Sequence, residues 1–339
     1  MFQEYIVEQV VKESLTIKSF YFSPKNGGPL PAYLAGQFVN IKVKPDGSEK
    51  ELVRSYTLSD KPGTPYLRLT VKREEYGKVS TYLHDEITVG STVLMSDPMG
   101  DFHLPVNNQG PLVLISGGVG ITPMLSVAEY VTDRQPQRQI YFIHSSLNRD
   151  VQPMLDRLKY LKTANDNFKL VIFHSDPLED ELIDIDYDYR GFITKDRLPR
   201  INHAEYMVCG PVAFMETIFS FLSEFEITED KIHFEFFQSP KSGESKQPVN
   251  ETASSRVKVT LLKSEKVLFW QEGAGTLLEL IESAGLQPDN SCRMGTCSTC
   301  QTRLVGGTFQ YEPEPFMEPE AGNVLLCCAI PTSNVEIDL

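Results

Sequence analysis

Three cysteines lie close together near the C-terminal end of the chain, and their spacing predicts a metal centre. Cys292, Cys297 and Cys300 form a C-x4-C-x2-C pattern, and Cys327 follows further along the chain. Four thiolates with this spacing are typical ligands of a [2Fe–2S] cluster. A disulfide knot and a zinc site are the alternatives. Zinc loops usually contain cysteine pairs spaced C-x2-C, whereas the three cysteines here are spaced C-x4-C-x2-C. The iron–sulfur interpretation is therefore favoured.

The residues around these cysteines resemble a plant-type ferredoxin domain. The resemblance covers Arg256 to Leu339 and rests on Ser-Cys-Arg-x-Gly-x-Cys-x-x-Cys and on the closing Cys-x-Ala-x-Pro. It implies an α+β β-grasp fold in which Cys327 is the fourth iron ligand. Cys328 then occupies a position that is usually aliphatic. Such a cluster accepts and donates one electron, so the rest of the chain is expected to supply or consume single electrons.

A stretch in the first hundred residues contains side chains that could bind an aromatic cofactor through its phosphates and its ring. On a strand, alternate residues share a face, so Arg54 and Tyr56 point one way and Ser55 and Thr57 the other. An arginine can clamp a pyrophosphate through two hydrogen bonds, and a tyrosine can lie flat on a ring system. An ordinary barrel strand would show the same alternation, so this stretch alone is weak evidence.

A second stretch follows, in which a glycine turn opens a short helix whose free N–H groups could receive phosphate oxygens. Gly77 allows the turn, and an ordinary capped helix is the alternative interpretation. The candidate cofactor-binding residues here are Val71, Lys72, Gly77, Lys78, Val79 and Ser80.

Together the two stretches resemble the flavin-binding barrel of the ferredoxin–NADP reductase superfamily, as does the closing Asp-Pro-Met-Gly-Asp-Phe from Asp97. The resemblance implies that Arg54 holds the flavin pyrophosphate, that Tyr56 packs on the isoalloxazine and that Thr57 faces its N5 atom. It also implies that Phe38 lines the flavin. FMN-using reductases of the phthalate dioxygenase type differ at the second stretch, so FAD is favoured.

A glycine-rich turn follows the apolar stretch Pro111–Ser116 and precedes a helical run at Met124–Thr132. Strand, glycine turn and helix open a dinucleotide-binding fold, because the glycines let the backbone approach a pyrophosphate. The strict G-x-G-x-x-G fingerprint is absent, and no acidic residue ends the second strand to hold a ribose. The candidate residues in the turn are Gly118, Gly120, Thr122 and Pro123.

The turn Gly-Gly-Val-Gly-Ile-Thr-Pro, together with Cys209-Gly210-Pro211, resembles the nicotinamide domain of the same superfamily. The resemblance implies that the Cys209 thiol lies beside the nicotinamide C4 and that Gly210 and Pro211 allow close backbone approach. A buried strand-end cysteine is the alternative. Residues 1–238 resemble the reductase portion of flavohaemoglobins, which implies that Glu235 and Phe237 lie near the isoalloxazine edge. The side chains expected to act in catalysis are Tyr56, Thr57, Cys209 and Glu235.

These motifs must be positioned by more than one folded unit, because 339 residues suit two or three domains. We expect an antiparallel β-barrel flavin domain at residues 1–108 and an α/β parallel-sheet nicotinamide domain at 109–238. A polar linker at 239–255 precedes the ferredoxin domain at 256–339. The expected strands are Gln37–Val43, Leu52–Leu58, Tyr66–Lys72, Thr92–Met95, Gln139–His144, Leu170–His174 and Glu205–Cys209, with helices around Pro153–Leu161 and from Thr276 to Gly285.

The charge and hydropathy of the chain exclude several kinds of partner. The net charge of −14 argues against nucleic acid and against an anionic membrane surface. There is no apolar run near the ~20 residues of a membrane span. The start Met-Phe-Gln-Glu lacks a signal peptide, so a reducing cytoplasm is the expected location. Six acidic residues between Glu179 and Asp188 predict a solvated loop, not a metal site.

The three modules predict one electron path. NADH would give a hydride to FAD, and the cluster would accept the electrons singly for a separate acceptor protein, such as a terminal oxygenase or hybrid cluster protein. NADPH is possible but less favoured, because Arg149 is the first cation after the second strand of the nicotinamide domain. The alternatives are a stand-alone diaphorase or ferric or flavin reductase, and a non-catalytic redox-sensing module. The ferredoxin domain has six Lys/Arg and eleven Asp/Glu, a net charge of 6 − 11 = −5, so an acidic docking face is expected.

Overall fold

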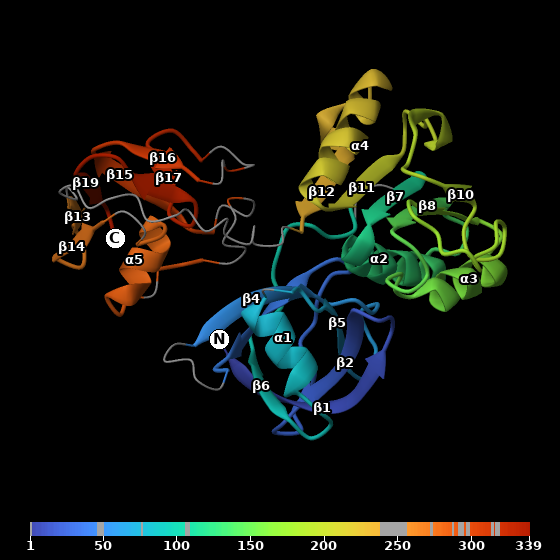
Figure 1. Ribbon diagram of the computed structural model, residues 1–339, viewed down its shortest axis with the longest axis horizontal. Helices are drawn as coiled ribbons and strands as arrows, with labels where there is room; N and C mark the ends of the chain where they lie inside the picture. Colours follow the sequence, from blue (N-terminus) through green and yellow to red (C-terminus); the bar gives the residue numbers. More distant parts are fainter. Residues whose placement is uncertain are drawn as a thin grey trace. The chain divides into compact units, whose positions relative to one another are not determined.

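A computed structural model describes most of the chain as two compact units, Met1–Pro240 and Lys241–Leu339 (Figure 1). The described residues are 2–45, 51–75, 77–105, 109–237, 256–271, 274–286, 288–290, 295, 299–312, 315 and 319–339. The predicted ligands Cys292 and Cys297 and the predicted linker at 239–255 lie outside them. No helix among the described residues is long and apolar enough to cross a membrane.

The first sheet is an antiparallel barrel, as predicted. Its strand order is β4-β3-β6-β1-β2-β5, and a bridge between Leu58 and Leu69 brings β4 next to β5 and closes the ring. Alternate residues of these strands are apolar and fully buried, for example Phe20 and Phe22 on β2. The strands are β1 (Gln3–Lys12), β2 (Ile17–Pro24), β3 (Phe38–Val43), β4 (Leu52–Thr57), β5 (Leu67–Lys72) and β6 (Thr92–Met95), and helix α1 (Lys78–Asp85) lies between β5 and β6.

The second sheet is parallel, with the order β10-β9-β8-β7-β11-β12. Its apolar strands are covered on both faces, because α2 and α3 contribute to one buried core and α4 to another. The chain reverses direction across the sheet between β7 and β11, and ligands of such folds bind at that point beyond the carboxyl ends of the strands. The elements are β7 (Leu112–Gly117), the 3-10 turn η1 (Gly118–Gly120), α2 (Ile121–Arg134), β8 (Ile140–Ser146), α3 (Leu155–Ala164), β9 (Phe168–His174), β10 (Tyr189–Arg190), the 3-10 turn η2 (Lys195–Arg197), β11 (Glu205–Gly210), α4 (Val212–Glu224), the 3-10 turn η3 (Glu229–Lys231) and β12 (Ile232–Phe236).

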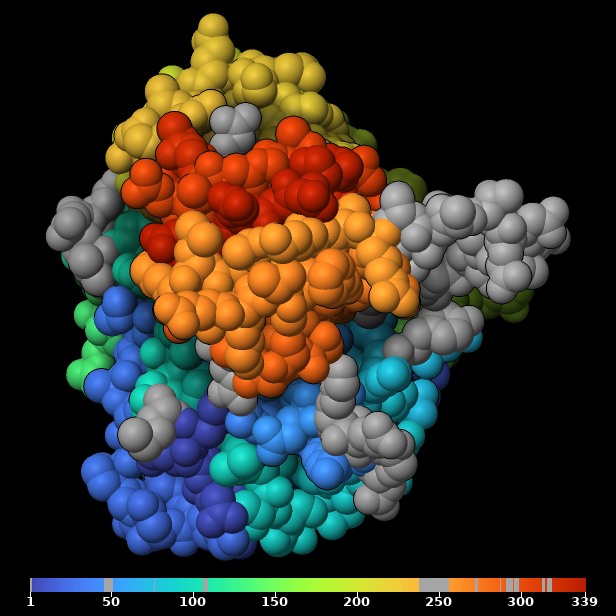
Figure 2. Space-filling model, turned by 90° about the vertical axis from the view of Figure 1, so that its left-hand side faces the viewer, coloured from blue at the N-terminus to red at the C-terminus, as the bar shows by residue number. Residues whose placement is uncertain are grey.

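The C-terminal unit has the expected α+β architecture, and Figure 2 shows one of its faces in orange and red. Its main sheet has the order β14-β13-β19-β15-β17, and β16 pairs with β18. A capping box begins the helix predicted from Thr276: the Thr276 hydroxyl accepts from the Glu279 N–H, and the Glu279 carboxylate accepts from the Thr276 N–H. The elements are β13 (Val257–Leu261), β14 (Lys266–Trp270), α5 (Leu277–Ser283), β15 (Gln301–Gly306), β16 (Phe309–Tyr311), β17 (Asn323–Leu325), β18 (Ala329–Pro331) and β19 (Val335–Ile337).

A buried charge network joins the barrel to helix α2. The Arg68 guanidinium of β5 lies 3.6 Å from both the Asp60 and the Glu129 carboxylates, and all three side chains are almost fully buried. Arg68 also donates to the Ser59 carbonyl at 2.6 Å, and Arg157 of α3 pairs with Glu129. Burial raises the pKa of Glu129 to about 7, although Arg68 opposes this shift. Arg68 therefore holds together one acid from the loop after β4 and one from helix α2, both almost fully buried.

Arg68→Met is expected to lower the unfolding free energy of the N-terminal unit by about 3–5 kcal/mol, because it leaves buried Asp60 without its ion pair and buried Glu129 with Arg157 alone. The raised pKa of Glu129 means that the folded state binds this proton more tightly than the unfolded state. The stability contributed by protonated Glu129 is therefore lost as pH rises towards 7. The loss of unfolding free energy in Arg68→Met should accordingly be larger at pH 8 than at pH 5.5. Urea denaturation at both pH values measures it.

Lys61→Met is the matched control, because Lys61 pairs with Asp133 across the same boundary at 3.2 Å, but both side chains are partly exposed. An exposed pair contributes at most about 1 kcal/mol. Equal losses in the two variants would contradict a special role for the buried network.

Candidate functional site

Two glycine turns that are far apart in the sequence meet at the switch point between β7 and β11. A Cβ atom on Gly120 would lie 2.4 Å from the Cys209 carbonyl oxygen, so only glycine fits there. Gly118 has a φ of +55°, and a Cβ atom on it would meet nothing within 4 Å. Gly120 is thus required for packing and Gly118 for its conformation. The turn presents open backbone where a pyrophosphate can approach.

The residues that follow the first turn are buried in the start of α2. Thr122 donates from its hydroxyl to the Val119 carbonyl at 3.1 Å, which closes the turn. Pro123 is the third residue of α2, three positions after Gly120, where a missing N–H costs nothing. The helix begins at Ile121, earlier than the predicted run from Met124, because its first turn needs no N–H partners. Both candidate residues therefore shape the turn at the switch point.

Cys209 is the next-to-last residue of β11, with its side chain fully buried, in register with Glu235 on the neighbouring strand β12. Burial raises the pKa of the Cys209 thiol well above its usual value, and the Glu235 carboxylate raises it further. The thiol therefore stays protonated at neutral pH, and it is a neutral group rather than a nucleophile. Next to it, Gly210 accepts at its carbonyl from the Phe237 N–H at 3.2 Å, and Pro211 is exposed before α4.

Phe214 of α4 contacts both glycine turns, although the sequence analysis did not select it. A Cβ atom on Gly210 would lie 2.7 Å from the Phe214 ring, and one on Gly117 would lie 3.1 Å from it. The ring therefore packs on the backbone of both glycine turns and fixes their separation. One sequence signal for it is an aromatic residue one helical turn after Cys-Gly-Pro, but only the fold shows that it also reaches the first turn.

The predicted flavin clamp lies on β4 of the barrel. Arg54 is exposed, and Tyr56 is half-buried against the barrel core. Burial raises the pKa of the Tyr56 hydroxyl, so this side chain stays neutral at physiological pH. On the other face, Thr57 is buried, and the Ser55 hydroxyl donates to the Asn40 side-chain oxygen at 2.7 Å. The predicted alternation along the strand is therefore present, with the cation reaching furthest into solvent.

The second predicted stretch forms the turn that leads into α1. The Ser80 hydroxyl donates to the Gly77 carbonyl and accepts from the Glu74 N–H, at 3.1 and 3.2 Å. A Cβ atom on Gly77 would lie 2.3 Å from the Ser80 oxygen, and φ at Gly77 is −83°. Space, rather than a left-handed turn, therefore requires the glycine. Of the remaining candidates, Val71 and Val79 are buried, Lys78 is exposed, and Lys72 pairs with Glu74 at 2.9 Å.

Phe38 is buried beneath the turn that contains Met99 and Gly100. A Cβ atom on Gly100, whose φ is +106°, would lie 2.7 Å from the Phe38 ring. The backbones of Phe38 and Met99 exchange two hydrogen bonds at 3.0 and 2.9 Å. The barrel core contains Val39, Ile41 and Val43 of this strand, so the Phe38 ring supports the turn from the opposite face of β3.

The described part of the cluster loop brings sulfur atoms and a backbone donor together. Cys300 and Cys327 are buried, and the Gly295 N–H donates to the Cys327 sulfur at 3.2 Å. Gly295 has a φ of +69°, and a Cβ atom there would lie 2.7 Å from Pro315. The Cys328 thiol is fully buried and donates to the Leu325 carbonyl at 3.6 Å. Two thiols and an N–H aimed at a sulfur fit an iron–sulfur cluster, whose potential such hydrogen bonds tune.

The acidic segment predicted to be a solvated loop is only partly so. Glu181 is buried, hydrogen-bonded to the His174 ring and accepts from the Arg149 N–H at 2.7 Å. Asp188 accepts from the Ile172 N–H at 2.7 Å. The expectation was wrong for these two residues because the chain folds back on the ends of β8 and β9. No group of three metal-ligating side chains occurs in the part of the chain that the structure describes.

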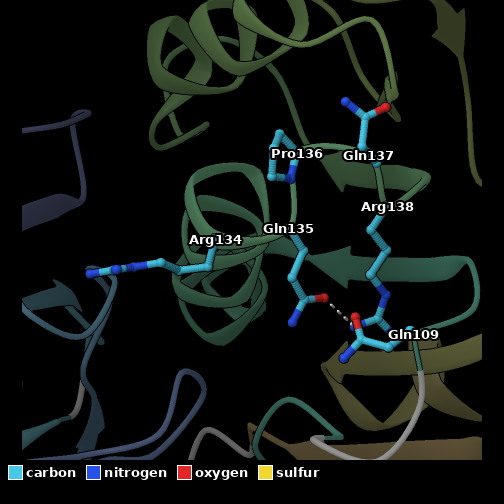
Figure 3. Close-up of a pocket in the computed structure, with 6 residues that line it drawn as sticks. All are labelled: Gln109, Arg134, Gln135, Pro136, Gln137 and Arg138. Atoms are coloured by element: carbon cyan, nitrogen blue, oxygen red, sulfur yellow. Dashed lines mark hydrogen bonds between the residues drawn. The ribbon is translucent and has the colours of Figure 1, made fainter.

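A shallow pocket lies far from these motifs (Figure 3). Its lining residues run from Arg134 to Arg138 and include Gln109, so it lies at the amino ends of β7 and β8. Arg138 is held there by the Gln135 side chain and the Gly110 carbonyl. Parallel sheets bind ligands at the opposite, carboxyl ends, and this pocket is therefore not the dinucleotide site.

Three protein-family models match the chain, one for each predicted module. They are an oxidoreductase FAD-binding domain over residues 6–104, an oxidoreductase NAD-binding domain over residues 114–219 and a 2Fe-2S iron-sulfur cluster binding domain over residues 260–332. The matched segments contain most of the barrel, most of the parallel sheet with both glycine turns, and the cysteine loop, respectively.

Individual proteins match over part or all of the chain. The flavohemoprotein of Bacillus cereus is 37% identical over 244 residues, which are 70% of this chain and 61% of that protein, so the chain spans less than two thirds of this relative. The FAD/NAD binding domain of nitric oxide dioxygenase from Vibrio cholerae has a TM-score of 0.64 at 28% identity, over 69% of this chain and 98% of that one. Phthalate dioxygenase reductase shares the fold over 100% of this chain and 98% of its own, with a TM-score of 0.72 at 22% identity.

Proposed function

The chain combines FAD-binding and NAD-binding oxidoreductase domains of the ferredoxin–NADP reductase superfamily with a C-terminal 2Fe-2S domain, and we propose that it carries electrons from NADH to a separate acceptor protein. The predictions of this superfamily, of its multidomain fold and of FAD, NAD and [2Fe–2S] as cofactors are confirmed. The finer steps, the residues that perform them and the acceptor belong to the proposal.

The observation that carries the proposal is the presence of all three modules on one chain. When bound, FAD accepts a hydride, which is two electrons, and can release electrons singly, whereas the cluster accepts one at a time. A protein that only reduced small acceptors from its flavin would have no use for the third module. The order of the modules therefore favours a path that ends at an acceptor outside this chain.

The residues of the nicotinamide domain support hydride transfer in two ways. They allow the nucleotide to approach the backbone, and the Cys209 side chain adds no charge beside it. The two glycine turns allow close backbone approach at the switch point, and Phe214 fixes their separation. The Cys209 thiol is neutral because of burial and Glu235, so it places no charge beside the nicotinamide ring. In the barrel, exposed Arg54 is placed to clamp a pyrophosphate, and half-buried Tyr56 to cover an aromatic ring.

We propose a redox protein such as a terminal oxygenase or hybrid cluster protein as the acceptor, in a reducing cytoplasm. Solved structures that resemble this chain include a cytochrome P450 reductase from Amycolatopsis, at 26% identity over 70% of each chain. Four glutamates between Tyr311 and Glu320 would contribute to the acidic docking face expected of the C-terminal unit. Glu312 and Glu320 are exposed, and Glu314 and Glu318 lie outside the described residues. Transient electron-transfer complexes gain association rate from such charge.

An anaerobic titration with NADH tests the electron path. We expect bleaching of the flavin absorption and, in the same protein, reduction of the cluster, seen as an electron paramagnetic resonance signal. Cytochrome c, a one-electron acceptor, is then expected to be reduced through the cluster, whereas ferricyanide accepts electrons from the flavin directly. Reduced flavin beside a cluster that stays oxidised would favour a stand-alone diaphorase. If NADH bleached neither group, the reductase function itself would be wrong.

A further inference from the structure

A buried polar cluster joins the loop after β8 to the loop after β9. The Glu181 carboxylate contacts the His174 ring with one oxygen and accepts from the Arg149 N–H with the other, at 2.7 Å. The second nitrogen of His174 contacts Gln152, which also accepts from the Ser146 hydroxyl at 2.9 Å. These side chains, apart from that of Arg149, are at least nine-tenths buried. The cluster therefore fixes both loops at the carboxyl ends of the two strands.

Fixing the two loops places two carboxylates on the Arg149 side chain. One guanidinium nitrogen lies 2.6 Å from the Asp180 carboxylate, and the other lies 3.8 Å from the Asp186 carboxylate. Asp186 is held in turn, because it accepts from the Leu182 N–H at 3.0 Å. Arg149 is the one cation in the sequence between the end of β8 and the start of α3. With two carboxylates around it, the local charge is 1 − 2 = −1.

This group lies where a dinucleotide places its adenosine ribose. In parallel α/β sheets the pyrophosphate lies at the first strand-to-helix turn, which here is η1, and the ribose lies at the end of the next strand, which here is β8. NAD and NADP differ only at this ribose, where NADP carries a 2′-phosphate. The same two loops expose the apolar side chains of Leu147, Leu182 and Ile185, which are 50%, 55% and 57% exposed and suited to cover an adenine ring.

We propose that Asp180 and Asp186 determine nucleotide specificity, because they occupy Arg149 and so deny it to the 2′-phosphate of NADPH. A dianionic 2′-phosphate would meet net negative charge, whereas the 2′-hydroxyl of NADH can donate a hydrogen bond to a carboxylate. Glu181 and His174 are positioning residues that keep the aspartates over Arg149. This inference rests on the proposed oxidation of a reduced nicotinamide nucleotide, and it specifies which nucleotide is used.

The test compares wild type with the double variant Asp180→Asn/Asp186→Asn. The ratio of kcat/KM for NADPH to that for NADH is expected to rise by about tenfold or more, because two opposing charges a few ångströms from the phosphate are removed. The change should fall mainly on KM. Affinity for adenosine 2′,5′-bisphosphate, measured by calorimetry, is expected to rise by a similar factor, while affinity for 5′-AMP stays within about twofold.

Two further variants separate the proposal from general charge and folding effects. Glu179→Gln removes one charge from the same loop, where Glu179 is exposed and has no contact with Arg149 among the described residues, so its nucleotide ratio should stay near that of wild type. Arg149→Ala, added to the double variant, should abolish the gain in bisphosphate binding. Retained far-ultraviolet circular dichroism and flavin absorption confirm that each variant is folded.

An unchanged nucleotide ratio and an unchanged bisphosphate affinity in the double variant would overturn the proposal. A wild-type protein that prefers NADPH would overturn it as well, as would an equal shift in Glu179→Gln. If neither nucleotide reduced the flavin, the proposed reductase function would fail, whereas the calorimetric comparison would still decide the inference about Arg149.

Discussion

Cys327→Ser is expected to abolish the [2Fe–2S] cluster, whereas Cys328→Ser is expected to retain it. The Cys327 sulfur accepts the Gly295 N–H at 3.2 Å, an interaction that favours a thiolate on this residue. The neighbouring Cys328 side chain is fully buried and donates to the Leu325 carbonyl at 3.6 Å, so it behaves as a small packing residue. Serine conserves the volume at both positions, so the two variants differ in ligation rather than in packing.

Iron content, the visible spectrum and electron paramagnetic resonance of the purified variants check this expectation. Cys327→Ser should lose the cluster signals while NADH-driven ferricyanide reduction, which needs only the flavin, persists. Cytochrome c reduction should fall to background. A normal cluster in Cys327→Ser together with a lost one in Cys328→Ser would show that the ligand assignment is reversed.

Arg54→Ala is expected to release FAD and to leave the iron–sulfur spectrum unchanged. The Arg54 side chain is exposed on β4, and two charge-assisted hydrogen bonds to a pyrophosphate are worth about 1.5–3 kcal/mol each. Loss of both would weaken FAD binding by at least about a hundredfold. The cluster should survive because its loop belongs to the separate C-terminal unit, Lys241–Leu339.

Gel filtration followed by quantification of released flavin and of iron measures both effects. Arg73→Ala is the matched control, since Arg73 is an exposed arginine of the same barrel that pairs with Asp85 at 2.8 Å. It should retain FAD. Stoichiometric FAD in Arg54→Ala after filtration would contradict the clamp, and loss of iron along with FAD would contradict the independence of the two units.

The elements near each motif followed from local sequence alone. The barrel strands, the parallel strands and the capped helix at Thr276 lie within a few residues of their predicted positions. Each depends on signals that act over short distances, namely alternation of apolar residues, turn glycines and a capping box. The sequence also identified the three modules, because cysteine spacing and glycine turns encode their chemistry in contiguous residues.

Contacts between segments that are distant in the sequence could not be predicted from these short-range signals. The sequence placed Gly120 and Cys209 in separate motifs, and only the strand order brings them within contact of each other. The network of Arg68 with Glu129 depends on how the barrel packs against helix α2. Neither contact produces a periodic pattern in the sequence, because each residue fits the ordinary pattern of its own strand, turn or helix.

The acidic segment between Glu179 and Asp188 shows both what the sequence predicts and what only the tertiary structure decides. Its composition predicted a solvated loop rather than a metal site, and the sequence singled out Arg149 as the first cation after the second strand of the nicotinamide domain. By itself, the sequence thus determined the modules, their cofactors and the residue types in each site. Only the tertiary structure decided that Glu181 is buried against His174 and that Asp180 and Asp186 surround Arg149. The physical reason is that pairing of charges depends on which loops meet at the end of a sheet, and that is fixed by the order of its strands.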